Sequence, residues 1–243
     1  MIQIIALNGK KRSGKDYMAD HLVKEHGFTK MSFASHLKEA LIVGLERNIP
    51  ESYFGVGYVD VLSGEGYDRD QPINLPTKIV YSVLLDALEY LDISLSSVAM
   101  IDSTIELRST NTKILNFVDD TIYINQKPVL EWSIRVLMQQ FGTDLVQTYC
   151  GKKYWAYQCM QDISSFSTEF NLKKFVIQDL RFDHEVEVLQ DKNAAMVFID
   201  TINPTTDSHI SEKDLFIPGV INIFNDRTEK FKTEIDKLIK DLK

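Results

Sequence analysis

Residues 2–20, which read IQIIALNGKKRSGKDYMAD, decide the fold that we predict for this chain. The segment opens with a short, mostly apolar run rich in β-branched residues, which is typical of a strand buried in a parallel sheet. A turn begins at Gly9, and the residues after Lys15 carry apolar side chains at helical spacing as far as Gly27. The segment therefore predicts a buried strand, a tight loop and a helix in direct succession.

The loop has the spacing G-x-x-x-x-G-K, from Gly9 through Gly14 to Lys15. The two glycines permit a backbone whose N–H groups converge on phosphate oxygens at the positive end of the helix, and Lys15 adds a charge for the β- and γ-phosphates. This pattern in this context predicts a P-loop. The position that usually holds Ser or Thr is Asp16, a carboxylate that a metal ion or Arg12 must neutralise beside phosphate. An ordinary glycine turn is the alternative.

Composition sets the outer bounds of the prediction. The 243 residues, of which 44% are hydrophobic, suffice for one large domain or for a core with an inserted subdomain. The net charge of −8 argues against extended binding along a nucleic-acid backbone. No apolar run approaches the roughly 20 residues that span a bilayer. Cys150 and Cys159 lack metal-ligand spacing and are predicted to be reduced packing residues of a cytoplasmic protein.

Beyond the first segment, predicted strands and helices alternate, which indicates a parallel sheet with right-handed crossovers. The predicted strands cover residues 29–33, 174–179, 196–200 and 220–224, and the predicted helices cover residues 36–47, 75–91, 131–145, 154–166 and 228–242. The glycine-rich residues 48–71 are predicted to form loops, and residues 93–129 mix polar turns with β-like segments. The sequence therefore predicts an α/β domain with an insertion.

Two basic residues outside the loop are candidates for binding phosphate. Lys38 stands in the first turn of predicted helix 36–47, a part of the fold that faces the acceptor site in P-loop kinases. Arg69 stands in the charged cluster YDRD, residues 67–70, where an arginine could clamp a phosphate. A solvated lysine and a solvent-exposed turn are the alternatives.

The predicted helix 131–145 carries a polar face that could bind a ligand. Arg135 and Gln139 are four residues apart and therefore share this face. Gly142 and Thr143 are expected to end the helix and to bring backbone and hydroxyl groups near the same ligand. A plain exposed helix face is the alternative.

Polar residues also follow the predicted strand 174–179, at the carboxyl end where ligands gather in open α/β sheets. They are Asp179, Arg181 and Glu185. A salt bridge between Arg181 and Glu185, which are one helical turn apart, is the alternative. The polar residues 203–218 are interpreted as a flexible cover over a site.

A P-loop on a parallel sheet occurs in kinases, GTPases and motor ATPases. The sequence has neither a GTPase-like N-K-x-D nor an apolar run ending in the acidic pair of an ATPase, and Arg69, Arg135 and Arg181 suit the capture of a second phosphate. The chain resembles the deoxynucleoside monophosphate kinases of tailed bacteriophages such as the T-even phages. The resemblance spans nearly the whole chain, is weakest at residues 94–128, and rests on the ordered segments GKKRSGKD, SFASHLKEAL, GYDRD, WSIRVLMQQFGTDL, YW, DLRFDHE, DSHISE and IFND.

The resemblance implies a three-layer α/β fold of the P-loop, nucleoside monophosphate kinase-like type. Residues 1–47 and 130–243 would form the kinase core, residues 48–129 an inserted, mainly helical substrate-binding subdomain, and residues 201–218 a lid-like segment. The implied reaction moves the γ-phosphoryl group of ATP, with Mg²⁺, to a deoxynucleoside 5′-monophosphate for phage DNA precursor synthesis. The implied partner is this small molecule, with no nucleic acid and no membrane. A homodimer in the cytoplasm, the host's if the chain is phage-encoded, is a further expectation.

The resemblance also assigns residues to sites. ATP and its phosphates would be bound by Gly9, Lys11, Arg12, Ser13, Gly14, Lys15, Asp16, Tyr17, Asn225 and Asp226. The monophosphate and its nucleoside would be bound by Lys38, Arg69, Arg135, Gln139, Gly142, Thr143, Trp155, Asp179, Arg181 and Glu185. Catalytic roles fall to Lys15, Arg12, Arg135 and Asp16, with Asp16 also the metal ligand. Positioning and positive charge would supply most of the rate enhancement.

The chain departs from the T-even pattern in ways that bear on substrate range. Val136 stands where that pattern has the second of two arginines, and Tyr17 and Leu180 each replace a threonine. The segment 201–218 contains no arginine, so Lys213, Arg12 or Arg135 would have to act on the transferring phosphate. Two alternatives stay open: a P-loop kinase for another small acceptor, such as a nucleoside or dephospho-coenzyme A, and a non-catalytic nucleotide-binding or assembly module.

Overall fold

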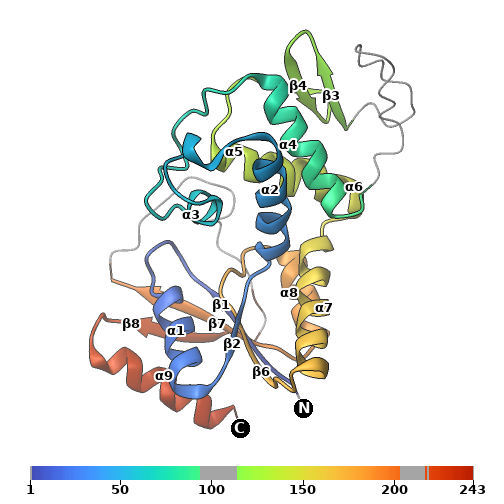
Figure 1. The fold of residues 1–243 in the computed structure, drawn as a ribbon. Helices are drawn as coiled ribbons and strands as arrows, with labels where there is room; N and C mark the ends of the chain where they lie inside the picture. The colour runs from blue at the N-terminus through green and yellow to red at the C-terminus, as the bar shows by residue number, and fades with distance from the viewer. Residues whose placement is uncertain (1, 94–113, 203–216, 218, 243) are drawn as a thin grey trace. The chain divides into compact units, whose positions relative to one another are not determined.

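The computed structural model describes residues 2–93, 114–202, 217 and 219–242, and the chain forms two compact units (Figure 1). The first unit joins Met1–Ser35 to Trp155–Lys243, and the second comprises His36–Tyr154. The predicted insertion, residues 48–129, falls within the second unit, and its role in substrate binding stays a prediction. Most of the predicted lid, including Lys213, lies outside the described residues.

The first unit is built on a five-stranded parallel sheet with the strand order β2-β6-β1-β7-β8. The strands are β1 (Gln3–Asn8), β2 (Thr29–Met31), β6 (Lys174–Ile177), β7 (Ala195–Thr201) and β8 (Ile221–Asn225). The apolar run of the first segment forms the central strand, where Ala6 is in register with Ile177 on one side and with Met196 on the other. The predicted parallel α/β sheet is confirmed.

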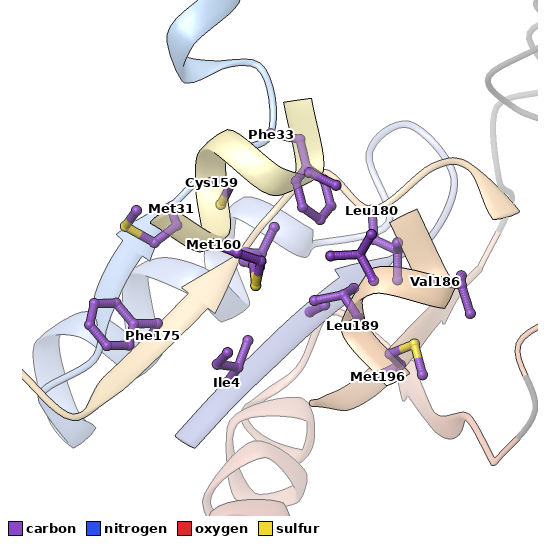
Figure 2. Close-up of a cluster of buried hydrophobic side chains, with 14 of the residues drawn as sticks. Ile4, Met31, Phe33, Cys159, Met160, Phe175, Leu180, Val186, Leu189 and Met196 are labelled. Atoms are coloured by element: carbon purple, nitrogen blue, oxygen red, sulfur yellow. The ribbon is translucent and has the colours of Figure 1, made fainter. Parts of the chain in front are cut away.

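Helices cover both faces of this sheet, because successive side chains of a strand point to opposite sides. On one face, α1 (Lys15–His26) and α9 (Glu229–Asp241) pack with Ile5 and Leu7 of β1. On the other face, α7 (Tyr154–Glu169) and α8 (Asp183–Gln190) pack with Ile4 and Ala6. Figure 2 shows the second of these cores, in which side chains from α7 and α8 lie against those of the strands. The predicted three-layer arrangement is therefore confirmed.

The two cysteines differ in their surroundings. Both are free thiols, and Cys159 is buried in the core of Figure 2, as predicted. Burial, the largest cause, and the nearby Asp179 raise the pKa of the Cys159 thiol, which favours its neutral form. Cys150 is exposed at the end of a short helix, so the prediction that it is a packing residue is wrong.

The second unit combines helices with a small antiparallel sheet. Its helical segments are α2 (Ser35–Asn48), the 3₁₀ helix η1 (Glu51–Tyr53), α3 (Tyr58–Ser63), α4 (Thr77–Tyr90), α5 (Ile134–Gln139), the π-helix η2 (Gln140–Gln147) and α6 (Thr148–Cys150). The strands β3 (Leu115–Val118), β4 (Thr121–Ile124) and β5 (Lys127–Val129) pair in sequence order. The sheet joins α4 through Tyr81, whose ring stacks on Phe117 at 5.3 Å between centroids.

Three local predictions are wrong. Residues 48–71 contain η1 and α3 in addition to loops, because Val61 and Leu62 bury an apolar face too short for periodicity to reveal. Gly142 and Thr143 do not end a helix, since both lie inside η2, which continues directly into α6. Helix α8 follows β6 in a segment for which no helix was predicted.

No helix in the described ranges is long and apolar enough to cross a membrane.

Candidate active site

The glycine loop between β1 and α1 has a backbone that requires both of its glycines. Gly9 has φ of +150°, and a Cβ there would lie 2.5 Å from the carbonyl oxygen of Ile199. Gly14 has φ of +103°, and a Cβ there would lie 2.3 Å from Nδ2 of Asn225. Gly14 also caps α1, so the loop ends at a helix N-terminus, where unpaired N–H groups attract anions.

The ammonium group of Lys15 lies over this loop. It donates to the carbonyl of Gly9 and, at 2.8 Å, to the carbonyl of Lys10. The turn below is closed by the N–H of Ser13, which donates to the same Lys10 carbonyl at 3.1 Å. Arg12 stands exposed in this turn with φ of +63°. An ammonium group that carbonyls hold at a helix N-terminus can exchange those carbonyls for phosphate oxygens.

Asn225 fastens the loop to the end of β8. Its side chain is buried, its Nδ2 donates to the carbonyl of Ser13 at 2.8 Å, and its Oδ1 accepts from the N–H of Arg227 at 2.8 Å. Thr201, at the end of β7, donates its hydroxyl to the Asn225 carbonyl at 3.1 Å. Both ends of the side-chain amide are thus used within the protein. Asn225 is a positioning residue for the loop, and its predicted contact with ATP stays a prediction.

Three other predicted ATP-binding residues lie on α1 or close to α9. Asp16 is exposed in the first turn of α1, directly after Lys15. Tyr17 is half exposed, and its ring lies 5.8 Å from that of Phe231 on α9. Asp226 accepts hydrogen bonds from the N–H and hydroxyl of Thr228, which lower the pKa of its carboxyl and help to begin α9. Lys11 is exposed in the loop.

Asp179 and Glu185 bind the main chain of the first unit. Asp179 Oδ1 accepts from the N–H of Phe33 at 2.9 Å, and its Oδ2 accepts from the Ser32 hydroxyl at 2.6 Å and from the N–H of Ala34 at 3.2 Å. These bonds tie the end of β6 to the segment that follows β2. Glu185 is buried and holds the first turn of α8.

The carboxyl group of Glu185 has a pKa well above its usual range. Its Oε2 accepts from the N–H groups of Arg181 at 2.7 Å and Phe182 at 3.0 Å. Burial is the largest influence, and with the charge of Asp179 it raises the pKa of Glu185 to about 8, although the two N–H groups oppose the rise. Glu185 therefore contacts Arg181 through the main chain. Trp155, which is also predicted to contact the nucleoside, is buried in α7 of the same unit.

The second unit brings together the three predicted phosphate-binding cations that it contains. The ammonium group of Lys38, from α2, donates to the hydroxyl of Ser63 at 3.3 Å. The guanidinium group of Arg69 donates to the carbonyl of Leu62 at 3.2 Å. The main-chain N–H of Arg135, in α5, donates to the carbonyl of Arg69 at 3.0 Å. The side chains of Lys38 and Arg69 thus meet at the carboxyl end of α3, and the main chain of Arg135 is joined to that of Arg69.

Local contacts explain why this convergence is held in place. Arg69 lies against Gly64, where a Cβ would be 2.9 Å from its Nε. The chain that follows Arg69 pairs with the segment before α5, since Ile73 donates to the carbonyl of Trp132 at 2.7 Å and Pro72 forms a bridge with Ser133. Glycine at position 64 also has φ of +79°, in the left-handed region, and leaves room for the Arg69 side chain beside the end of α3.

The guanidinium group of Arg135 forms a two-point contact with Asp70. Nε donates to Oδ1, and Nη2 donates to Oδ2 at 3.0 Å. Both side chains are partly open to solvent, at 39% exposure for Arg135 and 62% for Asp70. A phosphate group is recognised by arginine through the same paired donors. Sequence reasoning placed Asp70 in a charged cluster but missed it as the partner of Arg135, because no local spacing links residues this far apart.

The remaining residues predicted to bind the nucleoside lie at the end of α5 and in η2. Gln139 lies one turn beyond Arg135 and is partly buried, as Arg135 is. In η2, Gly142 is buried and Thr143 is exposed. Their predicted role in binding a nucleoside stays a prediction.

A glycine loop that follows the central strand of a parallel sheet and leads into a helix defines a P-loop nucleotide-binding protein of the kinase-like class. The sequence profile of the deoxynucleotide monophosphate kinase family matches residues 3–235. The chain belongs to this family, and the predicted resemblance is confirmed.

Two relatives have the same name as the family. The chain is 28% identical to the deoxynucleotide monophosphate kinase of Escherichia phage RB69 over 257 residues, which cover 98% of this chain and 100% of the relative. It is 28% identical to the deoxynucleotide monophosphate kinase of Enterobacteria phage T4 over 232 residues, which cover 93% of each chain. The similarity therefore extends over both units.

Proposed function

We propose that the chain transfers the γ-phosphoryl group of ATP to a deoxynucleoside 5′-monophosphate, which gives the diphosphate and ADP. Membership of the family supports this reaction. The observation that supports it most is that the cations predicted to bind phosphate fall into two groups, Lys15 over the glycine loop of one unit and the linked residues Lys38, Arg69 and Arg135 of the other. Transfer between two phosphorylated molecules requires a place for each.

The glycine loop would hold the ATP phosphates. Its N–H groups and the N-terminus of α1 favour negative charge, and Lys15 would leave the carbonyls of Gly9 and Lys10 to bind the β- and γ-phosphates. Arg12, exposed at the turn, would add a second cation beside the transferring group. Asn225 would keep the turn in place from below through the carbonyl of Ser13.

Asp16 fits the predicted magnesium site. Mg²⁺ prefers oxygen ligands, and the carboxylate of Asp16 is exposed in the first turn of α1, next to Lys15. Asp16 would hold the Mg²⁺, which would supply neutralisation of the charge that develops on the phosphates. This neutralisation would also remove the repulsion between Asp16 and the phosphates.

The acceptor phosphate would bind at the cluster of the second unit. The paired donors of Arg135 would turn from Asp70 to the phosphate, with Lys38 and Arg69 adding charge from the neighbouring segments. The nucleoside would be contacted by Gln139, Gly142, Thr143, Trp155, Asp179, Arg181 and Glu185. Catalysis would then come from alignment of the two substrates and from stabilisation of transition-state charge.

A coupled assay of ADP release tests the proposal, with each of the four deoxynucleoside monophosphates and their ribose counterparts as acceptors. We expect turnover that depends on a monophosphate acceptor. Turnover only with a nucleoside or with dephospho-coenzyme A would favour another small-molecule kinase. ATP binding without turnover of any acceptor would favour a non-catalytic module. A homodimer and a cytoplasmic location stay predictions.

A further inference from the structure

We propose that His21, His26 and Asp236 bind one divalent transition-metal ion of the Zn²⁺ class, at a site separate from the glycine loop. The Nε2 atoms of His21 and His26 lie 2.7 Å and 2.8 Å from the same oxygen, Oδ1 of Asp236. The three potential ligand atoms all lie within 4.8 Å of one another. They belong to α1 and α9, which pack on the same face of the sheet.

The convergence of the two imidazoles does not follow from helical spacing alone. Residues five apart on an ideal helix point roughly 140° away from each other. His26 is the last residue of α1, and Gly27 ends the helix with φ of +69°. The rings of His21 and His26 nevertheless meet edge to face, with 5.4 Å between their centroids, over one carboxylate. The fold therefore gathers three ligand groups that neither helix could present alone.

The donor set selects the class of metal. Two imidazole nitrogens and one carboxylate oxygen suit Zn²⁺ and similar ions, whereas Mg²⁺ prefers oxygen ligands alone. Three protein ligands leave a fourth position for water, as in open zinc sites. Bonds of about 2.1 Å in a tetrahedral site separate the ligand atoms by about 3.4 Å, so the present nitrogen–oxygen contacts must open by about 0.6 Å. Small rotations of the partly exposed side chains of His26 and Asp236 supply such a shift.

Burial and charge also favour an ion at this position. The His21 side chain is 7% exposed, whereas those of His26 and Asp236 are 21% and 37% exposed, so the site is closed on one side and accessible on the other. The ring of Tyr17 stacks beside His21, with 6.4 Å between centroids and an interplanar angle of 8°. The carboxylate of Asp236 supplies the negative charge that a divalent cation attracts. The nearby cation Lys174 is directed to the main-chain carbonyl of His26, at 3.0 Å.

Such an ion would lock α1 onto α9. His21 lies about 9 Å along the helix from Lys15, since each residue rises 1.5 Å, so the ion would not contact phosphates bound at the loop. The expected consequence is a more stable first unit.

The test uses the full chain, with its affinity tag removed and its metals stripped by a chelator. Zn²⁺ is then titrated against a chromophoric competitor, and Co²⁺ is added separately to read ligand geometry from its visible spectrum. We expect one ion per chain, an intense Co²⁺ spectrum of low coordination number, and a higher melting temperature with Zn²⁺. These readouts do not depend on kinase activity.

Three variants decide whether the ion is bound by these residues. Asp236→Asn keeps an oxygen that accepts from both imidazoles, and His26→Gln keeps a polar group of similar size, so both preserve most of the metal-free contacts. Each should lower Zn²⁺ affinity at least 10- to 100-fold, the loss that even outer partners of metal ligands cause. His36→Ala, on α2, should retain wild-type affinity. Binding below one ion per chain in the wild type, or unchanged affinity in Asp236→Asn and His26→Gln, would show two histidines merely hydrogen-bonded to an aspartate.

Discussion

Replacing Asn225 should damage the glycine loop without touching the acceptor site. Asn225→Ala removes the donor that reaches the Ser13 carbonyl at 2.8 Å, in a place where Ser13 is 1% exposed and Asn225 is 7% exposed. A buried carbonyl left without a partner costs about 1 to 3 kcal/mol. The lost acceptor for Arg227 matters less, because Arg227 is exposed and water can replace it.

The isosteric variant Asn225→Asp should be worse than Asn225→Ala. A carboxylate can still accept from Arg227, but it would place a negative oxygen where an N–H₂ group now faces the Ser13 carbonyl. The change therefore replaces an attraction with a repulsion in a buried position and adds the desolvation of a charge. We expect Asn225→Asp to lower the free energy of unfolding by more than about 1 kcal/mol beyond the loss in Asn225→Ala, since buried unpaired charges are among the costliest groups.

Urea unfolding and substrate kinetics would measure these effects together. If the loop is displaced, KM for ATP should rise about 5- to 150-fold in Asn225→Ala, which is the range that 1 to 3 kcal/mol implies, while KM for the monophosphate changes little. Thr201→Ser keeps the hydroxyl that binds the Asn225 carbonyl and serves as a control with near wild-type behaviour. Equal unfolding free energies and equal ATP kinetics for wild type, Asn225→Ala and Asn225→Asp would refute the reasoning.

Three further predictions concern charge. Lys15→Ala and Arg135→Ala should each lower phosphoryl transfer on the order of 10²-fold or more, because both cations would act on transition-state charge. The control Lys24→Ala should have no effect. Wild-type rates in Lys15→Ala or Arg135→Ala would contradict the assignment. Asp70→Asn should lower KM for the monophosphate by up to about 5-fold, because the partly exposed Asp70 carboxylate competes with the phosphate for Arg135 and contributes at most about 1 kcal/mol. A higher KM in this variant would instead show that Asp70 holds Arg135 in position for the phosphate. Glu185 has its pKa raised from 4.5 to about 8, so its contribution to stability is fully present below pH 4.5 and is lost as the pH rises through 8. Glu185→Gln should therefore flatten the decline of unfolding free energy across that window in urea titrations at several pH values, and an unchanged slope would show that the wild-type group is not protonated there.

The parts of the fold that local sequence determines were the predictable ones. The run before Gly9 is apolar on both faces, which only a central strand of a covered sheet requires, and the strand, loop and helix follow within twenty residues. Boundaries of such elements depend on side-chain periodicity and glycine positions, both visible in the sequence. Helix α8 and the π-helix η2 escaped prediction, because a helix of eight residues and a change of helical pitch leave little trace in periodicity.

The contacts that support the candidate site could not be predicted from the sequence. The bond from Asn225 to Ser13 joins residues 212 apart, and the pair of Arg135 with Asp70 joins residues 65 apart. No periodicity links such positions, since their distance is set by how strands and helices order themselves in space. The sequence indicates that these residue types can bind phosphate. It does not indicate which of them form hydrogen bonds or ion pairs within the protein.

The segment DLRFDHE shows how a family motif can combine support with function. Its two outer acids were expected to bind a nucleoside, yet Asp179 accepts from three groups near the end of β2, and Glu185 accepts from the N–H groups that begin α8. Arg181, between them, has its main chain fixed by Glu185 while its side chain is left to other contacts. Removal of Glu185 would thus shift Arg181, and removal of Asp179 would loosen the segment after β2, even if neither acid touched the substrate. Loss of activity in an alanine variant of Asp179 or Glu185 therefore cannot identify a substrate ligand. Glu185→Gln keeps the acceptor oxygen and so separates support of the main chain from recognition of the substrate by the carboxyl group.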